Sequence, residues 1–348
     1  MYYTKKSKEA QLHHLISSFI LLFVLIISSS IVTNTHIVYG QTNQTIAENE
    51  DLLNIQDIPL KKVHVGDIDV AYKMFGKGEP ILLFNGASDN MDAWDPSLLK
   101  GISSNHTVIV FDQRGIGNTT VGTNPYTPQQ LANDTAGLLD ALKIPKADVM
   151  GYSLGSYLAQ QLTIMYPNKV NSLVLIGSSC GGKDHTPKPA EFLKLQSDIV
   201  NNSLHNIPMT HEQINSLQTA SLGSGWVKLH PESLGVPANI TTFQQLKPGI
   251  PPDILNNQNN VGKHWEDNPN WSGACDELAK LDKPTLVITG TDDNFYQPHV
   301  NSLKIAEKIP GAWLVQIKNA GHAVPDQYPV EISKILNTFL LTTTKSRG

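Results

Sequence analysis

A serine, an aspartate and a histidine stand along this chain where they could form a site for acyl transfer. Ser153 lies between glycines in Gly151-Tyr152-Ser153-Leu154-Gly155, after a short apolar run and before a stretch of helical character. A serine hydroxyl is almost non-nucleophilic at neutral pH, so it needs a histidine base and a carboxylate to orient that base. By itself the pentapeptide also fits a glycine-rich turn with an incidental serine, so its context must decide.

Two later stretches offer the acid and the base. The apolar run 286–289 is followed by Gly290-Thr291-Asp292-Asp293-Asn294, and the run 313–317 is followed by a loop that contains His322. The carboxyl ends of parallel strands lie at one edge of a sheet, so we expect Ser153, an aspartate of the 292–293 pair and His322 to meet there. Taken singly, the aspartate could be an ordinary turn residue and His322 could have only a structural role. The shared context of all three favours a catalytic interpretation.

The elements that must position these residues alternate between apolar runs and helical patterns. We expect strands over residues 61–65, 68–75, 80–84, 107–111, 147–150, 170–176, 284–289 and 313–317, and core helices over 127–142 and 154–165. Short, fully apolar runs are typical of strands buried on both faces of a parallel sheet. Their alternation with helices predicts parallel βαβ units, and therefore an α/β fold.

Residues 183–275 interrupt this alternation and are rich in Asn, Pro, Gln and Ser. Helical patterns over 190–200 and 210–219 predict a helical lid inserted into an α/β core formed by residues 59–182 and 276–343. Five aromatic residues could line a pocket there: Phe192, Trp226, Phe243, Trp265 and Trp271. The alternative, which we favour for most of them, is that they form the insertion's own small core.

From about residue 60 to residue 342 the chain resembles the α/β-hydrolase superfamily. The resemblance is carried by Asn85-Gly86 with Trp94, the Asp112-Gln113-Arg114-Gly115 loop, the 151–155 elbow, the 290–293 turn and the 320–322 loop. It implies a mostly parallel eight-stranded sheet with helices on both faces and a helical lid. It also implies a triad of Ser153, Asp293 and His322, and an oxyanion hole made by the backbone N–H groups of Ala87 and Leu154.

The resemblance favours one of two adjacent aspartates as the catalytic acid, and the sequence departs from the family pattern in one loop. The Gly-x-x-Asp spacing from Gly290 selects Asp293, which leaves Asp292 as a solvated turn residue. The family usually has His-Gly where this chain has Asn85-Gly86, so the packing of that loop is less well predicted. A serine at position 153 excludes the branches that use an aspartate nucleophile.

The leading functional interpretation is an exported serine hydrolase that cleaves a small carboxylic ester, lactone or related acyl substrate. The same triad also fits a cofactor-free perhydrolase of the haloperoxidase type or a C–C bond hydrolase. From another class, the fold can serve as a ligand-binding receptor module with slow hydrolysis. The net charge of −5 gives no reason to expect nucleic acid as a partner, and the 12 histidines show no metal-ligand spacing. We expect no metal and no organic cofactor.

The N-terminus is expected to direct the chain out of the cytoplasm. Lysines at 5, 6 and 8 precede an apolar stretch over 15–32, which predicts an export signal over 1–40 or, if it is not cleaved, a membrane anchor. Membrane contact is expected only through that uncleaved segment, which would leave the protein extracellular or at the cell surface. Residues 41–58 are expected to be a disordered lead-in.

Two further features depend on export. Seven Asn-x-Ser/Thr triplets are possible glycan acceptors in an exported chain, and they begin at Asn43, Asn105, Asn118, Asn133, Asn201, Asn239 and Asn270. The two cysteines, Cys180 and Cys275, flank the insertion and are either bridged across its base or remain separate thiols.

Overall fold

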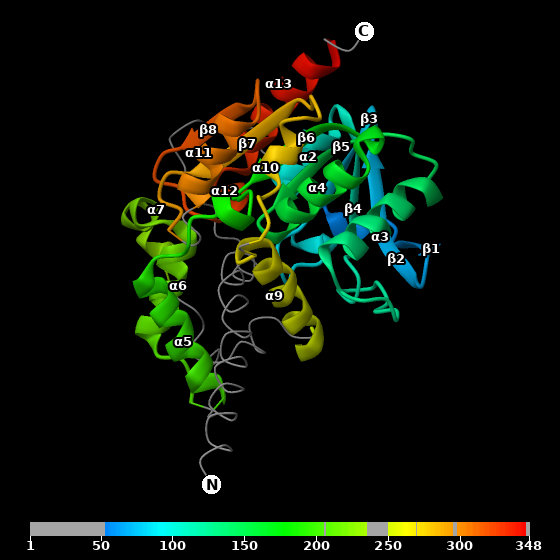
Figure 1. The fold of residues 1–348 in the computed structure, drawn as a ribbon. Helices are drawn as coiled ribbons and strands as arrows, with labels where there is room; N and C mark the ends of the chain where they lie inside the picture. Colours follow the sequence, from blue (N-terminus) through cyan, green and yellow to red (C-terminus); the bar gives the residue numbers. More distant parts are fainter. Residues whose placement is uncertain (1–52, 205–206, 235–249, 269, 295–297, 346–348) are drawn as a thin grey trace.

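The computed structural model describes residues 53–204, 207–234, 250–268, 270–294 and 298–345. The predicted export signal lies outside these residues and stays a prediction. No helix in these ranges is both long and apolar enough to cross a membrane. The chain forms one eight-stranded sheet in the order β1-β2-β4-β3-β5-β6-β7-β8, with helices packed against it (Figure 1).

The sheet is antiparallel at one edge and parallel elsewhere. Its strands are β1 (Lys61–Val65), β2 (Ile68–Gly76), β3 (Glu79–Phe84), β4 (His106–Phe111), β5 (Ala147–Tyr152), β6 (Val170–Ile176), β7 (Thr285–Gly290) and β8 (Trp313–Ile317). The pairs β1–β2 and β2–β4 are antiparallel, and the five remaining pairs are parallel. The eight strands agree with the predicted ones to within two residues at each end, and the mostly parallel sheet is confirmed.

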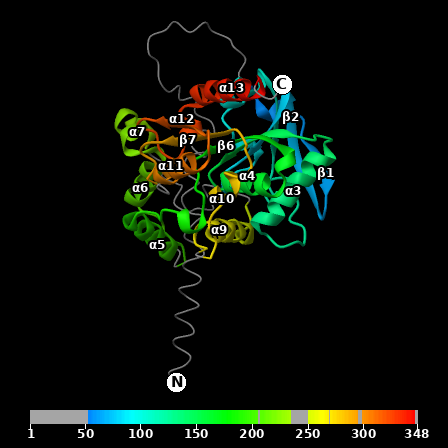
Figure 2. The same cartoon turned by 45° about the horizontal axis from the view of Figure 1, so that its top comes forward.

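Alternate residues of each strand enter two separate cores. Ile81 and Leu83 of β3 pack on one face, while Leu82 and Phe84 pack on the other, as the two-residue period of a strand requires. The first face is covered by α2 (Pro96–Ser103) and α13 (Pro329–Lys345), with α12 (Val324–Gln327) before α13. The second is covered by α3 (Pro128–Ala141), α4 (Leu154–Met165), α10 (Cys275–Leu278) and α11 (Pro298–Lys308) (Figure 2).

The helix ends follow local capping chemistry. The hydroxyl of Thr127 accepts a hydrogen bond from the Gln130 N–H, and Pro128 occupies the first turn of α3. Thr127 is therefore the cap that precedes the helix, and Pro128 is its first residue. In α6 (His211–Leu222), Thr210 and Gln213 form a reciprocal capping box.

The insertion between β6 and β7 is helical where the structure describes it. It holds α5 (Ala190–Leu204), α6 (His211–Leu222), α7 (Ser224–Leu229) and α9 (Pro252–Glu266). In both views α5, α6 and α7 lie on the side of α11 and α12, whereas α9 lies near α3 and α4 (Figures 1 and 2). Of the aromatic residues that could line a pocket or form the insertion's own core, Phe243 lies outside the described residues. Trp265 is 1% exposed and belongs to the core beside α4.

The last part of the expected disordered lead-in is in fact ordered. Residues Ile55–Asp57 form a short 3₁₀ helix, and Ile55 is buried against the α2 and α13 face. The buried Lys73 ammonium donates to Ile55 O (2.9 Å) and to the Asp92 carboxylate (2.6 Å). The polar composition of the lead-in did not predict this contact, because the contact depends only on the apolar side chain and the main-chain oxygen of Ile55.

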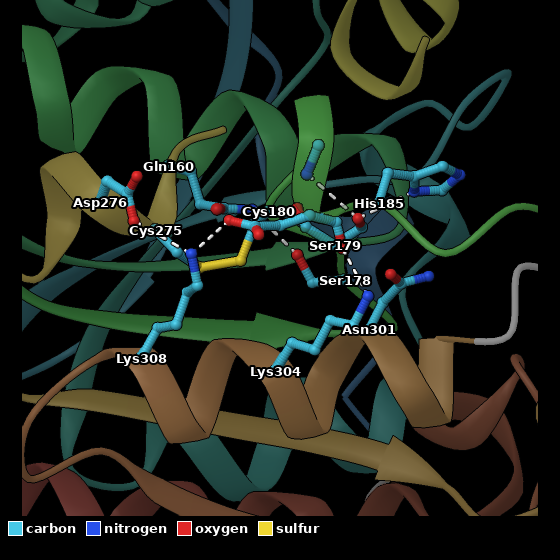
Figure 3. Close-up of a disulfide and its surroundings, with 12 residues drawn as sticks. Gln160, Ser178, Ser179, Cys180, His185, Cys275, Asp276, Asn301, Lys304 and Lys308 are labelled. Atoms are coloured by element: carbon cyan, nitrogen blue, oxygen red, sulfur yellow. Dashed lines mark hydrogen bonds and ion pairs between the residues drawn. A yellow bond between two sulfur atoms is a disulfide. The ribbon is translucent and has the colours of Figure 1, made fainter. Parts of the chain in front are cut away.

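The two ends of the insertion are joined at its base (Figure 3). Cys180 and Cys275 form a disulfide, which settles the alternative that the sequence left open. Beside it, the Lys308 ammonium of α11 contacts Asp184 and Asp276, which come from opposite ends of the insertion. A cross-link and a double ion pair therefore close the insertion at the same place.

Candidate active site

Ser153 stands in a strained turn between β5 and α4. Its backbone has φ 53° and ψ −124°, a conformation that residues other than glycine rarely adopt. The Ser153 N–H donates to Ile176 O at 2.9 Å. A Cβ on Gly151 would collide with Gly155 O, and one on Gly155 would collide with Phe84 O, so the turn requires both glycines.

Ser153, His322 and Asp293 form one hydrogen-bonded chain. His322 Nε2 lies 2.9 Å from Ser153 Oγ, and His322 Nδ1 lies 2.8 Å from Asp293 Oδ2. All three residues are at most 3% exposed. A carboxylate can only accept at Nδ1, so a neutral ring holds its proton there and turns the Nε2 lone pair toward the serine hydroxyl.

Main-chain hydrogen bonds join the loops that follow β7 and β8. The Thr291 N–H donates to Ile317 O (3.0 Å), and the Asp292 N–H donates to Ala320 O (2.9 Å). A Cβ on Gly290 would collide with Ala320 O, so the loops can approach this closely only with glycine at that position. The carboxylate and the imidazole are therefore held by one rigid unit.

The imidazole of His322 is enclosed by residues that follow two other strands. Gly177 after β6 has φ +58°, and a Cβ there would lie 2.9 Å from His322 Cε1. The Tyr152 ring of β5 lies with its centroid 5.3 Å from that of His322, and Trp94 lies 6.5 Å beyond. Only glycine at position 177 leaves the imidazole room to reach Ser153.

Asp293, and not Asp292, contacts the histidine. The expectation that Asp292 is a solvated turn residue is wrong. Its carboxylate accepts the Gly225 N–H at 2.8 Å and the Ser224 hydroxyl at 3.3 Å, at the start of α7. Asp292 thus ties the insertion to the turn that carries Asp293, a role that spacing along the chain could not indicate.

The loop after β3 carries Ala87, the expected oxyanion donor, and is fixed by buried side chains. Asp112 accepts the Met91 N–H at 2.7 Å, and burial raises the pKa of this carboxyl although two N–H donors oppose the increase. The Asn85 amide donates to Asn90 O, so the residue that replaces the family's usual histidine closes the loop on itself. Leu154, the other expected donor, opens α4, where an N–H has no acceptor within the helix.

Arg114 in the neighbouring loop has a structural role. Its guanidinium forms paired hydrogen bonds with Asp134 and with Asp67, and also donates to Val121 O. The hydrogen bond from Arg114 lowers the pKa of Asp67 well below its usual range, although desolvation opposes it. The guanidinium N–H groups are thus used in these hydrogen bonds, so Arg114 is not placed to bind an anionic ligand.

Gln258 of α9 contacts the loop after β3, a contact that the sequence did not predict. Its side-chain oxygen accepts the Ser88 N–H at 2.8 Å, and the residue is 1% exposed. Ile254 packs on Gly115, and Trp265 stacks on Tyr157 with ring centroids 5.4 Å apart. The helical spacing of Ile254, Gln258 and Trp265 was the available signal that one face of α9 is buried.

Among the residues that the structure describes, no group of three or more His, Cys, Asp or Glu side chains is placed to hold a metal ion. The expectation that the protein needs no metal or organic cofactor stays a prediction.

The comparisons with known proteins agree with this architecture. The family model described as the alpha/beta hydrolase fold matches residues 79–328, and the chain belongs to this family. A poly(3-hydroxyalkanoate) depolymerase of Ectopseudomonas oleovorans is 27% identical over 267 residues, which cover 75% of this chain and 84% of that protein.

Solved structures show the same fold at lower identity. A thermophilic esterase from Thermogutta terrifontis has a TM-score of 0.63 and 22% identity, covering 81% of this chain and 99% of its own. The enol-lactonase from Burkholderia xenovorans LB400 has a TM-score of 0.61 and 19% identity, covering 81% of this chain and all of its own (100%). Family membership and fold together identify the chain as an α/β hydrolase.

Proposed function

We propose that the chain is an exported serine hydrolase that cleaves a small carboxylic ester or related acyl substrate. The observation that carries the proposal is the buried hydrogen-bonded chain from Ser153 through His322 to Asp293. The names of the similar proteins, an esterase, an enol-lactonase and a depolymerase, support hydrolysis as the reaction. Export is inferred from the N-terminal sequence alone.

In the proposed mechanism, His322 Nε2 takes the Ser153 proton while Oγ bonds to the substrate carbonyl carbon. The tetrahedral intermediate collapses when the bond to the leaving oxygen breaks and the imidazolium returns its proton to that oxygen. Water, deprotonated by the same imidazole, then attacks the carbonyl carbon of the acyl-enzyme. The bond to Ser153 Oγ breaks, the imidazolium returns the proton to Oγ, and the carboxylic acid leaves. Asp293 holds the ring in its productive tautomer and stabilises the imidazolium.

The negative charge on the tetrahedral oxygen would be stabilised by the N–H groups of Leu154 and Ala87. Leu154 follows the nucleophile at the helix N-terminus, and Ala87 lies in the loop fixed by Asp112 and Gln258. Donors held rigid before the reaction stabilise the charge without reorganisation, which is why a fixed loop is valuable at this position.

A cavity within the insertion could hold part of the substrate, although Ser153, Asp293 and His322 are not among the residues that line it. It measures about 720 Å³ and lies between α5, α6 and the turn after β7, with Asn294, the neighbour of Asp293, in its wall. Its lining is mixed: Phe192, Leu195 and Ala220 are apolar, whereas Glu191 and Glu212 carry carboxylates. This volume is within the range usual for small-molecule sites, and we propose that residues 183–275 act as the lid over it.

The test is turnover of p-nitrophenyl acetate and p-nitrophenyl octanoate by the purified protein without its N-terminal segment. We expect hydrolysis that Ser153→Ala abolishes, and the ratio of the two rates measures the length of acyl chain that the site accepts. Binding of these esters without turnover would instead support the receptor interpretation and overturn the proposal.

A further inference from the structure

The carbonyl oxygen of Ser153 accepts two hydrogen bonds from one residue of α4. Ser156, which is fully buried, donates its main-chain N–H to Ser153 O at 2.8 Å and its hydroxyl at 2.6 Å. The peptide unit that has this carbonyl at one end has the N–H of Leu154 at the other. A group that holds or polarises Ser153 O therefore acts on the proposed oxyanion donor.

Two further buried side chains stand in line behind the Ser156 hydroxyl. Ser156 Oγ lies 2.7 Å from Ser178 Oγ. The Gln160 amide donates to Ser178 Oγ and to Ser179 O, both at 3.0 Å (Figure 3). Ser178 comes directly after Gly177, the residue that makes room for the catalytic imidazole. The chain of hydrogen bonds thus joins the segment after β6 to the turn that carries the nucleophile.

The two ends of this chain determine its direction. Ser153 O is a carbonyl oxygen and can only accept, so the single hydrogen of the Ser156 hydroxyl points toward it. Ser179 O can also only accept, so Gln160 turns its side-chain nitrogen toward Ser179 O and Ser178 Oγ. The hydrogen of the Ser178 hydroxyl is then available to Ser156 Oγ. Each donor in the chain therefore points toward the carbonyl of Ser153.

The amide of Gln160 gives up its acceptor to maintain these donations. Within the described part of the chain, Gln160 Oε1 has no hydrogen-bond partner, although the residue is fully buried. An unpartnered buried acceptor is unfavourable, so the value of this side chain lies in its N–H groups. Hydrogen bonds linked in one direction polarise one another, which makes the last donor stronger than an isolated hydroxyl.

We propose that Gln160, Ser178 and Ser156 form a hydrogen-bond relay that orients and polarises the Ser153–Leu154 peptide. Electron density drawn toward Ser153 O leaves the Leu154 N–H more positive, so it binds the oxyanion of the tetrahedral intermediate more strongly. The three residues are positioning residues, since none of them contacts the reacting atoms. This inference rests on the proposed hydrolase function and adds the groups that support its oxyanion donor.

The first experiment removes the hydroxyl that contacts Ser153 O. Ser156→Ala should lower kcat/KM for p-nitrophenyl acetate about fivefold to thirtyfold, which is less than the 10²-fold to 10³-fold loss typical for removal of a whole oxyanion donor. The inhibition constant of trifluoroacetone should rise by the same factor, because Ser153 Oγ adds to its carbonyl carbon and leaves an oxyanion in the same place. The apparent pKa of the pH–rate profile should not change, because the relay does not act through His322.

The second experiment tests the relay apart from that contact. Ser178→Ala leaves both hydrogen bonds to Ser153 O in place and removes only the donor behind Ser156. We expect kcat/KM to fall about threefold to tenfold, again with a matching rise in the inhibition constant. This variant decides the question even if Ser156→Ala fails to fold.

The matched control is Thr163→Val in the same helix. Thr163 is also fully buried, and its hydroxyl donates to Ala159 O at 2.7 Å without contacting the Ser153 turn. Its removal should lower the melting temperature, as Ser156→Ala does, while kcat/KM stays within about twofold of the wild type. Equal losses of activity in Thr163→Val and Ser156→Ala would show a merely structural role and overturn the relay.

Three other results also overturn the relay while leaving the hydrolase function standing. They are a wild-type rate in Ser156→Ala or Ser178→Ala, a lower rate with an unchanged inhibition constant, and a shifted pH–rate profile that points to His322 instead. If the wild type hydrolyses no activated ester, the hydrolase function and the relay fall together.

Discussion

The substitution Ser153→Ala removes the hydroxyl of Ser153 and leaves the backbone turn unchanged, so it separates the contribution of each. The turn depends on Gly151, Gly155 and the hydrogen bond to Ile176 O, none of which Ser153→Ala changes. We therefore expect turnover of p-nitrophenyl acetate to fall by about 10⁴-fold or more, with the melting temperature and circular dichroism preserved. Near-normal turnover in this variant would show that Ser153 is not the nucleophile.

The adjacent aspartates make a matched pair, since both are buried or half-buried and only one contacts His322. Asp293→Asn should lower kcat about 10³-fold to 10⁴-fold, because the amide favours the wrong tautomer of the imidazole. Asp292→Asn keeps an oxygen for the Gly225 N–H, so kcat should stay within about tenfold of the wild type. Steady-state kinetics decide between them, and the opposite ranking would transfer the orienting role to Asp292.

Among the elements, the base of the insertion is the most directly testable. The Cys180–Cys275 bridge spans a sequence separation of 95, and a cross-link over a loop of this length contributes about 2–5 kcal/mol to the free energy of unfolding. Replacing both cysteines by serine should lower thermal stability accordingly. Activity at 25 °C should persist, because Lys308 still joins Asp184 and Asp276.

Thermal melts with and without reductant provide the control for this pair. The wild type should lose stability in reductant, and the double serine variant should be insensitive to it. If the melting temperature of the wild type did not change after verified reduction of the disulfide, the disulfide would not contribute to stability, and the other contacts at the base of the insertion would be sufficient.

The strand-to-helix junctions were predictable from sequence because their causes are local. The glycines at 151 and 155 and the apolar runs beside them define the β5–α4 turn without any distant partner. Gln258 was not predictable in the same way, because it stands among Asn256, Asn257 and Asn259 and resembles them in chemistry. Helical spacing indicates that Gln258 lies on a buried face of α9, but it does not indicate that this face packs against a loop 170 residues away.

The choice between Asp292 and Asp293 also shows that sequence spacing alone does not assign the roles of site residues. Both follow β7 and both have carboxylates, and only the resemblance to a family favoured one of them. The direction of each side chain depends on the turn held by Thr291 and on the insertion at Gly225. Spacing identified the turn, while three-dimensional contacts assigned the roles.

For the molecule as a whole, acid should weaken folding through His185 at the start of the insertion. Burial lowers the pKa of His185, an effect that Glu266 opposes and Lys188 and Lys304 reinforce. The unfolded chain takes up a proton as the pH falls below about 6.5, whereas the folded chain does so only at lower pH. Stability from this residue is therefore complete above pH 6.5 and is lost as the pH falls toward the folded value.

Urea unfolding at pH 7.5 and pH 5.5 measures this dependence. The wild type should lose more stability over this interval than His185→Asn, which keeps a polar group for the Ser179 hydroxyl but cannot be charged. Identical losses in the two proteins would assign the acid sensitivity to other groups.

The closure of the insertion at one point also makes it separable from the core. The Cα atoms of Cys180 and Cys275 are 5.3 Å apart, a gap that a linker of one or two residues can span. The segment between them could thus be exchanged for that of another family member without changing the path of the sheet. Such chimaeras should keep Ser153 and take their choice of substrate from the donor, provided that the donor segment replaces the contacts that Gly225 makes with Asp292 and Gln258 makes with the loop of Ala87.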